Sequence, residues 1–277
     1  MRIATLGNSH VGMLKAASER PEFDGISFTW MVRQSDRSQN IQITGSEIVD
    51  TTTGQAQYMG PGLAQTIDVS DFDAMILVGN TVLIRDVALL CRSHYVPAWF
   101  EPRRVKALIA SGDSERRVLH PMTEMAFKAA ICSAIQNDFT HAWATKLQHA
   151  TNAPLFVVPP PYANAVALHP PAERFPALKQ MDALAVSDQL AAAFDEAHGD
   201  AFAAFGNAYV VAQDRSSVTK GFFTAEAFAR GAVRVDPTKP FRDNDVVHGN
   251  PDLGALILRK IVGKFRSSDG GSGANPP

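Results

Sequence analysis

Three side chains near the two ends of the chain have the residue types of a nucleophilic catalyst. Ser9 lies in "IATLGNSHVG" (3–12), where an apolar run ends in a small polar turn. His248 lies in "DNDVVHGNPDLGALIL" (243–258), three residues after Asp245. A serine hydroxyl is a good nucleophile only when a base takes its proton, and the base needs a third group to hold its tautomer. Because an Asp-x-x-His turn lets the carboxylate reach Nδ1 and leaves Nε2 facing outward, these residues are candidates for nucleophile, base and orienting acid.

Two other interpretations of the first stretch compete with this one. A dinucleotide-binding loop needs the pattern G-x-G-x-x-G, because its backbone must approach a pyrophosphate closely. Here four residues separate Gly7 from Gly12, and Arg33 and Gln34 stand where a ribose-binding acid is expected. Serine is also a favoured helix N-cap, so Ser9 taken alone would equally fit a plain strand-to-helix turn.

Short apolar runs alternate with helical patterns along the chain. This alternation predicts a parallel sheet with helices on both faces, and ligands bind such sheets beyond the carboxyl ends of the strands. That rule places the loops 7–10, 79–81 and 159–164 on one rim. The predicted strands are 2–6, 27–32, 73–79, 154–161 and 208–213, with a hairpin over 40–52 appended to the sheet. The predicted helices are 12–20, 121–150, 181–199 and 251–265, the second with Met125, Ala129, Cys132 and Ile135 at helical spacing.

The conjunction of these motifs resembles the SGNH, or GDSL-type, hydrolase superfamily. "GNSH" (7–10) stands where the family has its G-D-S signature, an Asn follows a middle strand, and "DVVHGNPDLGALIL" is similar to the family's closing block. The resemblance implies a flavodoxin-like three-layer α/β/α sandwich with a central parallel sheet, as one domain over residues 1–265. It further implies Ser9 as nucleophile, His248 as base and Asp245 as the acid that orients the base.

The resemblance also implies a class of reaction. Family members cleave or transfer acyl esters, often acetyl groups on carbohydrates, and need no metal or other cofactor. We therefore expect a serine esterase whose partner is a small-molecule or glycan ester. Two alternatives stay open: an O-acyltransferase with the same triad, and an SGNH-like binding module without catalysis.

The middle block departs from the family pattern. The family has G-x-N-D there, whereas this chain has "LVGNTV" (77–82), with Gly79 and Asn80 adjacent and no Asp. Asn80 can still donate a side-chain N–H to an oxyanion, together with the backbone N–H of Ser9. The glycine that would complete the oxyanion hole is not identifiable, and the candidates are Gly45, Gly60 and Gly62.

Five further residues on the predicted rim are expected near the substrate: Asn8, His10, Gly79, Tyr162 and Asn164. Asn8 replaces the family's commoner Asp. His10 is expected to pack at the rim and to point away from Ser9. The triple proline 159–161 is expected to shape one wall of the pocket, with Tyr162 or Asn164 touching the substrate.

Composition narrows the remaining classes of function. The chain has 277 residues, 45% of them hydrophobic, with a formal net charge of −2 and no long basic run, which argues against nucleic-acid binding. Its two cysteines, Cys91 and Cys132, lie in apolar helical patterns and are expected in the core, with no disulfide framework or zinc site. No signal-peptide pattern and no apolar run near ~18 residues occurs, so a cytoplasmic protein without a membrane partner is expected. The stretch 266–277 is expected to be a disordered tail.

Overall fold

The computed structural model describes residues 1–33, 40–51, 62–91, 93–103, 106, 120–168, 176–236, 241 and 245–269. Its centre is a five-stranded sheet in which every neighbouring pair is parallel. The strands lie in the order β11-β9-β6-β1-β2. Numbered by their succession in the chain, these strands have the order 2-1-3-4-5 of a doubly wound sheet, with its switch point between β1 and β6. Their bounds are β1 Arg2–Gly7, β2 Ser27–Val32, β6 Ala74–Val78, β9 Leu155–Val158 and β11 Ala208–Val210.

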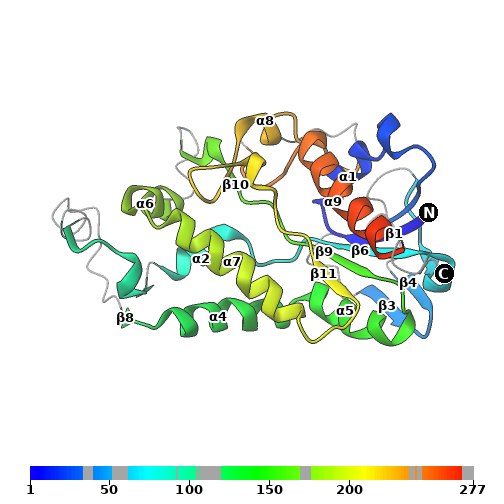
Figure 1. Cartoon of the computed structure of the whole chain (residues 1–277), viewed down its shortest axis with the longest axis horizontal. Coiled ribbons are helices and arrows are strands. Elements are labelled where there is room, and N and C mark those ends of the chain that lie inside the picture. Colours follow the sequence, from blue (N-terminus) through cyan, green and yellow to red (C-terminus); the bar gives the residue numbers. More distant parts are fainter. Residues whose placement is uncertain are drawn as a thin grey trace, which may run out of the picture.

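Helices cover both faces of this sheet, so the molecule has three layers (Figure 1). Side chains alternate across a strand, so Ile3 faces one cluster of buried residues and Ala4 the other. One layer contains α1 Val11–Ala17 and α9 Pro251–Asp269. The other contains α2 Ile84–Leu90, α4 Glu124–Gln136, α5 Phe139–Ala150, α6 Pro176–Leu184 and α7 Ser187–Phe202. The predicted parallel sheet with helices on both faces is confirmed.

Two long helices of the sequence analysis are each divided. The predicted helix 121–150 is interrupted before α5, where the Asp138 side chain accepts a hydrogen bond from the Thr140 N–H and caps the new helix. The predicted helix 181–199 is interrupted between α6 and α7, where Ala185 has φ +57°. An uninterrupted right-handed helix cannot contain that conformation. Gly199 lies inside α7 and does not end it.

The buried face of α4 also differs from the predicted one. Met125 and Ala129 are exposed, and the residues that enter the core are Phe127, Ile131 and Ile135. Both sets repeat at helical spacing, and only packing against α7 distinguishes them. Cys91 is buried as expected, whereas Cys132 is half-buried at the edge of the core.

Smaller elements surround the sheet. The predicted hairpin forms as β3 Ile41–Thr44 and β4 Glu47–Asp50, but it joins β5 Thr66–Asp68 in a sheet of its own and does not extend the main one. The remaining strands are β7 His94–Tyr95, β8 His120–Pro121, β10 Ala163–Asn164, β12 Val218–Thr219 and β13 Phe223–Thr224. Among the elements whose bounds are described, there are also the helix α8 Glu226–Ala229 and the 3-10 turns η1 Pro21–Phe23, η4 Val69–Asp71, η5 Pro97–Trp99, η6 Ala165–Leu168 and η7 Arg215–Ser217.

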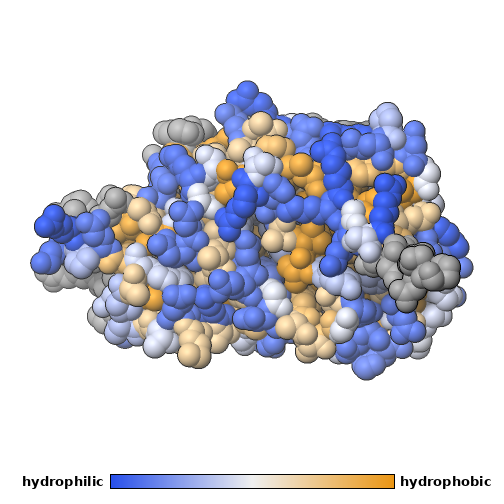
Figure 2. Space-filling model, in the orientation of Figure 1, coloured by the Kyte–Doolittle hydropathy of each residue, from blue (hydrophilic) through white to orange (hydrophobic). Residues whose placement is uncertain are grey.

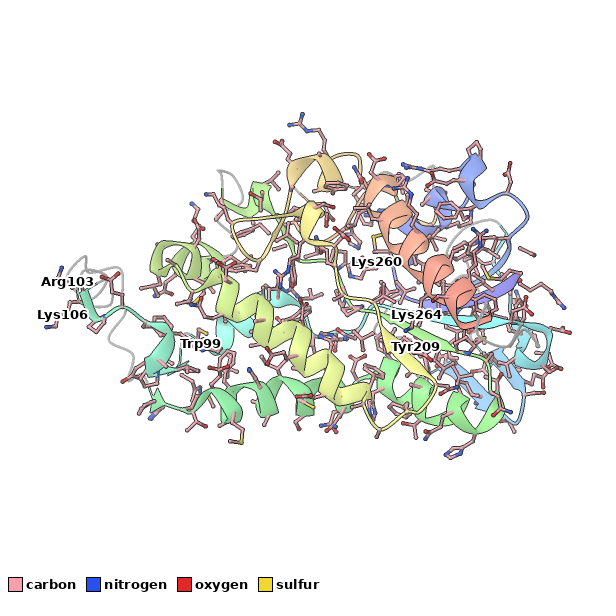
Figure 3. All side chains as sticks on the ribbon, in the orientation of Figure 1. Trp99, Arg103, Lys106, Tyr209, Lys260 and Lys264 are labelled. Carbon is pink, nitrogen blue, oxygen red and sulfur yellow. The ribbon has the colours of Figure 1, made fainter. Side chains whose placement is uncertain are left out.

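The last helix, α9, is longer than predicted and contacts β11 near its end. It continues to Asp269, so residues 266–269 are helical, while 270–277 lie outside the described residues. Lys264 of α9 and Tyr209 of β11 lie close together in Figure 3, with Nζ of Lys264 5.1 Å from the centroid of the Tyr209 ring. Figure 2 shows a largely hydrophilic face here, with hydrophobic residues gathered between α7 and α9.

Helices α1 and α9 approach each other closely because of glycine. A Cβ on Gly254 would lie 2.1 Å from the backbone oxygen of Met13, and a Cβ on Gly12 would lie 2.4 Å from that of Val233. Both contacts exclude any larger residue unless the backbone moves. The first turn of α1, which follows Ser9, is therefore packed closely against α9 and against the segment around Val233.

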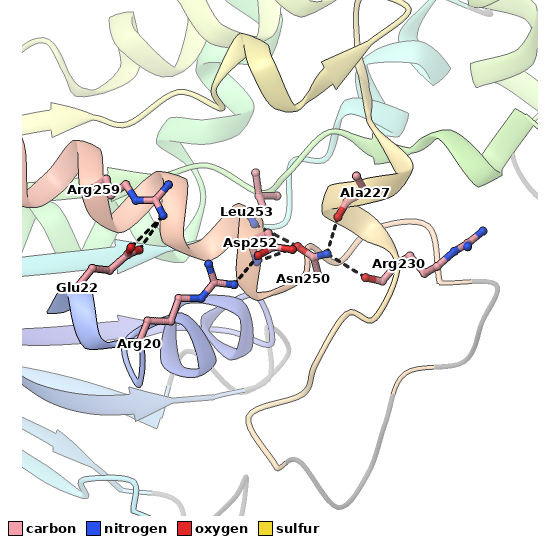
Figure 4. A network of polar contacts seen from close by, with 8 residues as sticks. All are labelled: Arg20, Glu22, Ala227, Arg230, Asn250, Asp252, Leu253 and Arg259. Carbon is pink, nitrogen blue, oxygen red and sulfur yellow. Dashed lines mark hydrogen bonds and ion pairs between the residues drawn. The ribbon is translucent and has the colours of Figure 1, made fainter. Parts of the chain in front are cut away.

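Asn250 fixes the start of α9 (Figure 4). Its Oδ1 accepts hydrogen bonds from the backbone N–H groups of Asp252 and Leu253, at 3.0 and 3.1 Å, as an N-cap does. Its Nδ2 donates to the carbonyl oxygens of Ala227 and Arg230. One buried side chain thus connects α8, the start of α9 and the segment that carries His248.

Replacing Asn250 by Ala is expected to lower the free energy of unfolding by about 1–2 kcal/mol, because the cap and two bonds to carbonyls are lost. Urea denaturation followed by circular dichroism measures this change. The control is Arg20→Ala, which removes the exposed ion pair with Asp252 at the same helix end and is expected to cost less than about 1 kcal/mol. Equal effects of the two substitutions would contradict the anchoring role of Asn250.

Candidate active site

Ser9 lies at the switch point of the sheet, directly beyond the carboxyl end of β1. Gly7 and Val78 are paired in the last register of β1 and β6. Ser9 and Asn80 each follow that pair by two residues. The side chain of Ser9 does not cap α1, whose N-cap is His10 without a side-chain cap bond. The plain helix-cap interpretation of Ser9 therefore does not describe its contacts.

The structure brings Ser9, His248 and Asp245 together. The Oγ of Ser9 lies 2.8 Å from Nε2 of His248, across 239 residues of sequence. Nδ1 of the same ring lies 2.9 Å from Oδ2 and 3.0 Å from Oδ1 of Asp245. Since a carboxylate accepts, Nδ1 carries the hydrogen and Nε2 offers its lone pair to the serine hydroxyl. This is the arrangement of a nucleophile, a base and an orienting acid.

Asp245 is held as an anion. Burial alone would raise the pKa of its carboxyl, but bonding to the His248 ring and to the backbone N–H groups of Val247 and His248 outweighs burial, so the pKa lies below its ordinary value. Asp252 instead pairs with Arg20, away from the histidine. Asp243, the other nearby acid, lies outside the described residues. The turn geometry thus supports Asp245 as the acid that orients His248.

Two rings enclose the imidazole of His248. The ring of Phe241 stacks on it with a centroid distance of 3.8 Å, and the His10 ring lies 4.7 Å away. His10 is buried, and burial together with the neighbouring His248 lowers its pKa to about 3, so it is neutral at pH 7. His10 was expected to be a packing residue, and its ring packs against that of His248. No sequence pattern marked Phe241.

Asn164 has a positioning role that the sequence did not reveal. It is buried, and its Nδ2 donates to the carbonyl oxygens of Asp245 and His248 at 2.9 and 3.1 Å. Its backbone N–H donates to Val246 O. Asn164 therefore fastens both ends of the Asp-x-x-His turn, and its contacts are with the protein.

The triple proline and Tyr162 form a different wall from the one expected. They line a small recess together with residues of β9, α7 and α9, and Ser9, Asp245 and His248 are not among its lining residues. Tyr162 is buried, which raises the pKa of its hydroxyl. A contact between Tyr162 and a substrate at Ser9 finds no support in this geometry.

The turn after β6 is held on both sides. Gly79 has φ +74°, and a Cβ there would lie 2.4 Å from Oδ1 of Asn8, so this position requires glycine. The Thr140 hydroxyl donates to the carbonyl of Gly79, and Asp138 accepts bonds from the backbone N–H and hydroxyl of Thr81. No acid follows Asn80 directly in the sequence, and Asp138 supplies a carboxylate to the neighbouring Thr81.

Asn80 is buried beside His198. Its Nδ2 lies 2.9 Å from Nε2 of His198, and its Oδ1 has no hydrogen-bond partner among the described residues. One N–H of the Asn80 amide is thus used within the protein, and the second has no acceptor among the described residues.

The candidate glycines of the oxyanion hole are placed elsewhere or not described. Gly45 lies in the turn of the β3–β4 hairpin, Gly62 directly precedes the Trp30–Leu63 bridge, and Gly60 lies outside the described residues. Arg33 follows β2 at the same edge of the sheet, but its backbone N–H cannot serve as the second donor, because it already donates to Gly7 O. Its side chain forms a buried ion pair with Asp50. A second backbone donor is therefore not assigned.

No family model, no curated protein and no solved structure matches the chain, so the comparison with known proteins assigns it to no family. Among the described residues, no group of three or more His, Cys, Asp or Glu side chains could hold a metal ion. Within the same residues, no helix is both long and apolar enough to span a bilayer.

Replacing Asp245 by Asn is expected to slow hydrolysis of an aryl acetate more than the same change at Asp243 or Asp252. An amide keeps the shape of the carboxylate but can hold the wrong tautomer of His248, and the cost in a comparable triad is ~10⁴-fold in kcat. We expect the Asp245 variant to be slower than the other two by at least ~10-fold, about 1.4 kcal/mol of barrier. An equal loss at either neighbouring acid would refute the assignment.

Proposed function

We propose that this protein is a serine hydrolase that cleaves acyl esters, of the SGNH type. The observation that carries the proposal is the continuous chain of hydrogen bonds from Ser9 through His248 to Asp245. Ser9 is half-buried, so its hydroxyl is not sealed inside the core. The geometry meets the requirement that nucleophile and base lie within about 2.6–3.2 Å and that a third group orients the base.

The mechanism follows from the contacts of each side chain. Nε2 of His248 takes the hydroxyl proton as Oγ of Ser9 attacks the ester carbonyl. Asp245, already ionised, stabilises the imidazolium that forms. His248 then gives the proton to the departing alcohol, which leaves an acyl group on Ser9. A water molecule, deprotonated by the same histidine, hydrolyses this acyl-enzyme and restores Ser9.

The tetrahedral oxyanion needs preorganised hydrogen-bond donors at the carboxyl edge of the sheet. The backbone N–H of Ser9 donates to no acceptor among the described residues. The Asn80 amide follows the neighbouring strand in the same register and has one N–H not engaged by His198. We assign these two groups to the tetrahedral oxyanion, because preorganised donors there contribute strongly to the rate.

The SGNH type rests on the order of motifs along the fold. The G-N-S-H turn follows the first strand, Gly79-Asn80 follows the third strand of the 2-1-3-4-5 sheet, and the Asp-x-x-His turn precedes the last helix. Members of the family that this order resembles act on acyl esters, so we propose an ester, in particular an O-acetyl ester of a small molecule or carbohydrate, as the substrate class.

Replacing Ser9 by Ala is expected to lower kcat for an aryl acetate by roughly 10³-fold or more, because the nucleophile is lost. The same variant should not be labelled by a fluorophosphonate probe, which reacts with activated serines. Ser18→Ala at the end of α1 is the matched control and should keep both properties, since the Ser18 hydroxyl only donates to Lys15 O. Labelling of the Ser9 variant would refute the proposal, and a wild-type protein that resists the probe would indicate a binding module.

Replacing Asn80 by Ala is expected to lower kcat on the order of 10²-fold, about 2.7 kcal/mol, as loss of one oxyanion donor does. KM should change little, because the donor acts mainly in the transition state. Steady-state kinetics on the same ester measure both quantities. A loss of less than a few-fold would mean that another group donates to the oxyanion.

A further inference from the structure

A buried histidine of α7 contacts the candidate oxyanion donor. His198 is fully buried, and its nearest ring is that of Phe194, at 4.3 Å between centroids. Its Nδ1 lies 2.8 Å from the backbone oxygen of Phe194, one helical turn earlier, and its Nε2 lies 2.9 Å from Nδ2 of Asn80. The two partners together use both nitrogens of the ring.

The contact with Phe194 determines the tautomer of His198. A carbonyl oxygen only accepts, so the hydrogen of the neutral ring must be on Nδ1. Burial lowers the pKa of His198 to about 4, and the ring therefore stays neutral at pH 7. Nε2 then has a lone pair and no hydrogen, so it can only accept from Asn80.

This acceptor in turn determines which way the Asn80 amide faces. An Asn side chain can rotate by half a turn and exchange its NH₂ and its carbonyl oxygen. With the NH₂ toward His198, the amide makes a hydrogen bond. After the exchange, the carbonyl oxygen would face the lone pair of Nε2, and the two acceptors would repel each other.

We propose that His198 is a positioning residue that fixes the side-chain amide of Asn80 as an N–H donor at the switch point of the sheet. The inference rests on the proposed function in one respect, the use of the second Asn80 N–H by the oxyanion. In the exchanged orientation, the carbonyl oxygen of Asn80 would stand where the NH₂ group was. It would repel the negative charge of the oxyanion and could not donate a hydrogen bond to it.

The contact of His198 with Asn80 acts on the side-chain amide and not on the backbone. A buried imidazole is costlier than an apolar side chain of similar size, unless its nitrogens are paired. The backbone beside Asn80 is already held from α5, through Asp138 to Thr81 and through Thr140 to Gly79. These bonds leave the rotation of the Asn80 side-chain amide undetermined. His198 is the hydrogen-bond partner of that amide.

The first test needs no activity. Nitrogen-15 NMR of the wild-type protein at pH 7 should show His198 with a protonated Nδ1 and an unprotonated Nε2. It should also show an Asn80 amide N–H signal, identified by its loss in Asn80→Ala, that shifts in His198→Phe. A hydrogen on Nε2, or an Asn80 amide that does not respond to His198→Phe, would overturn the inference whether or not the protein is an esterase.

The second test separates positioning from folding by kinetics. His198→Phe should lower kcat roughly 10-fold with KM changed less than twofold, and the double variant with Asn80→Ala should be no slower than Asn80→Ala alone. His198→Gln should retain most of kcat, because its side-chain oxygen can accept from Asn80. This second substitution keeps the test decisive if the Phe variant does not fold.

The control is His141→Phe, a half-buried histidine on α5 whose Nε2 donates to Ala201 O and which should leave kcat within twofold. Additive effects of the His198 and Asn80 substitutions would overturn the inference while leaving the esterase proposal intact. An unaffected Ser9→Ala variant would instead overturn the proposed function, and NMR would still decide the orientation of the amide.

Discussion

The need to cover both faces of the central parallel sheet governs the rest of the structure. Strand β1 is buried on both sides, and the short helix α1 does not cover its face of the sheet alone, so a second helix with an apolar side packs beside it. Helix α9 does so from the other end of the chain and packs closely on α1 through Gly254. The segment that directly precedes α9 is thereby brought to the carboxyl end of β1. Burial of apolar surface, which alone says nothing about chemistry, therefore joins His248 to Ser9.

Buried amides convert this approximate placement into hydrogen-bond geometry. Asn164 fastens the Asp-x-x-His turn from β10, and Asn250 fastens its far side to α8 and α9. His198 reaches Asn80 from α7. Each of these side chains is buried and makes at least one hydrogen bond to a defined partner, while Oδ1 of Asn80 and Oδ1 of Asn164 have none among the described residues. The candidate site is thus supported from elements on both faces of the sheet.

Two strands of the central sheet could be predicted closely, whereas β9 and β11 are shorter than the predicted strands 154–161 and 208–213. The strand 27–32 has the predicted bounds. The predicted strand 73–79 is longer than β6 by one residue at each end, and its continuous apolar run marks a strand that is buried on both faces. The break before α5 depends on Asp138, which caps a helix and also bonds Thr81. That second bond comes from tertiary packing. The buried stripe of α4 likewise depends on where α7 lies.

The sequence by itself determined the local parts of the candidate site. His248 follows Asp245 by three positions, and at that spacing a carboxylate can reach the ring within one turn, so their contact is encoded in the turn. Only the tertiary structure decided the long-range contacts: Ser9 meets this turn from 239 positions away, and Asn80 meets His198 across 118 positions. The physical reason is that spacing along the chain specifies contacts within a turn or a helix, whereas contacts between distant segments depend on how the apolar faces of the sheet and its helices pack together.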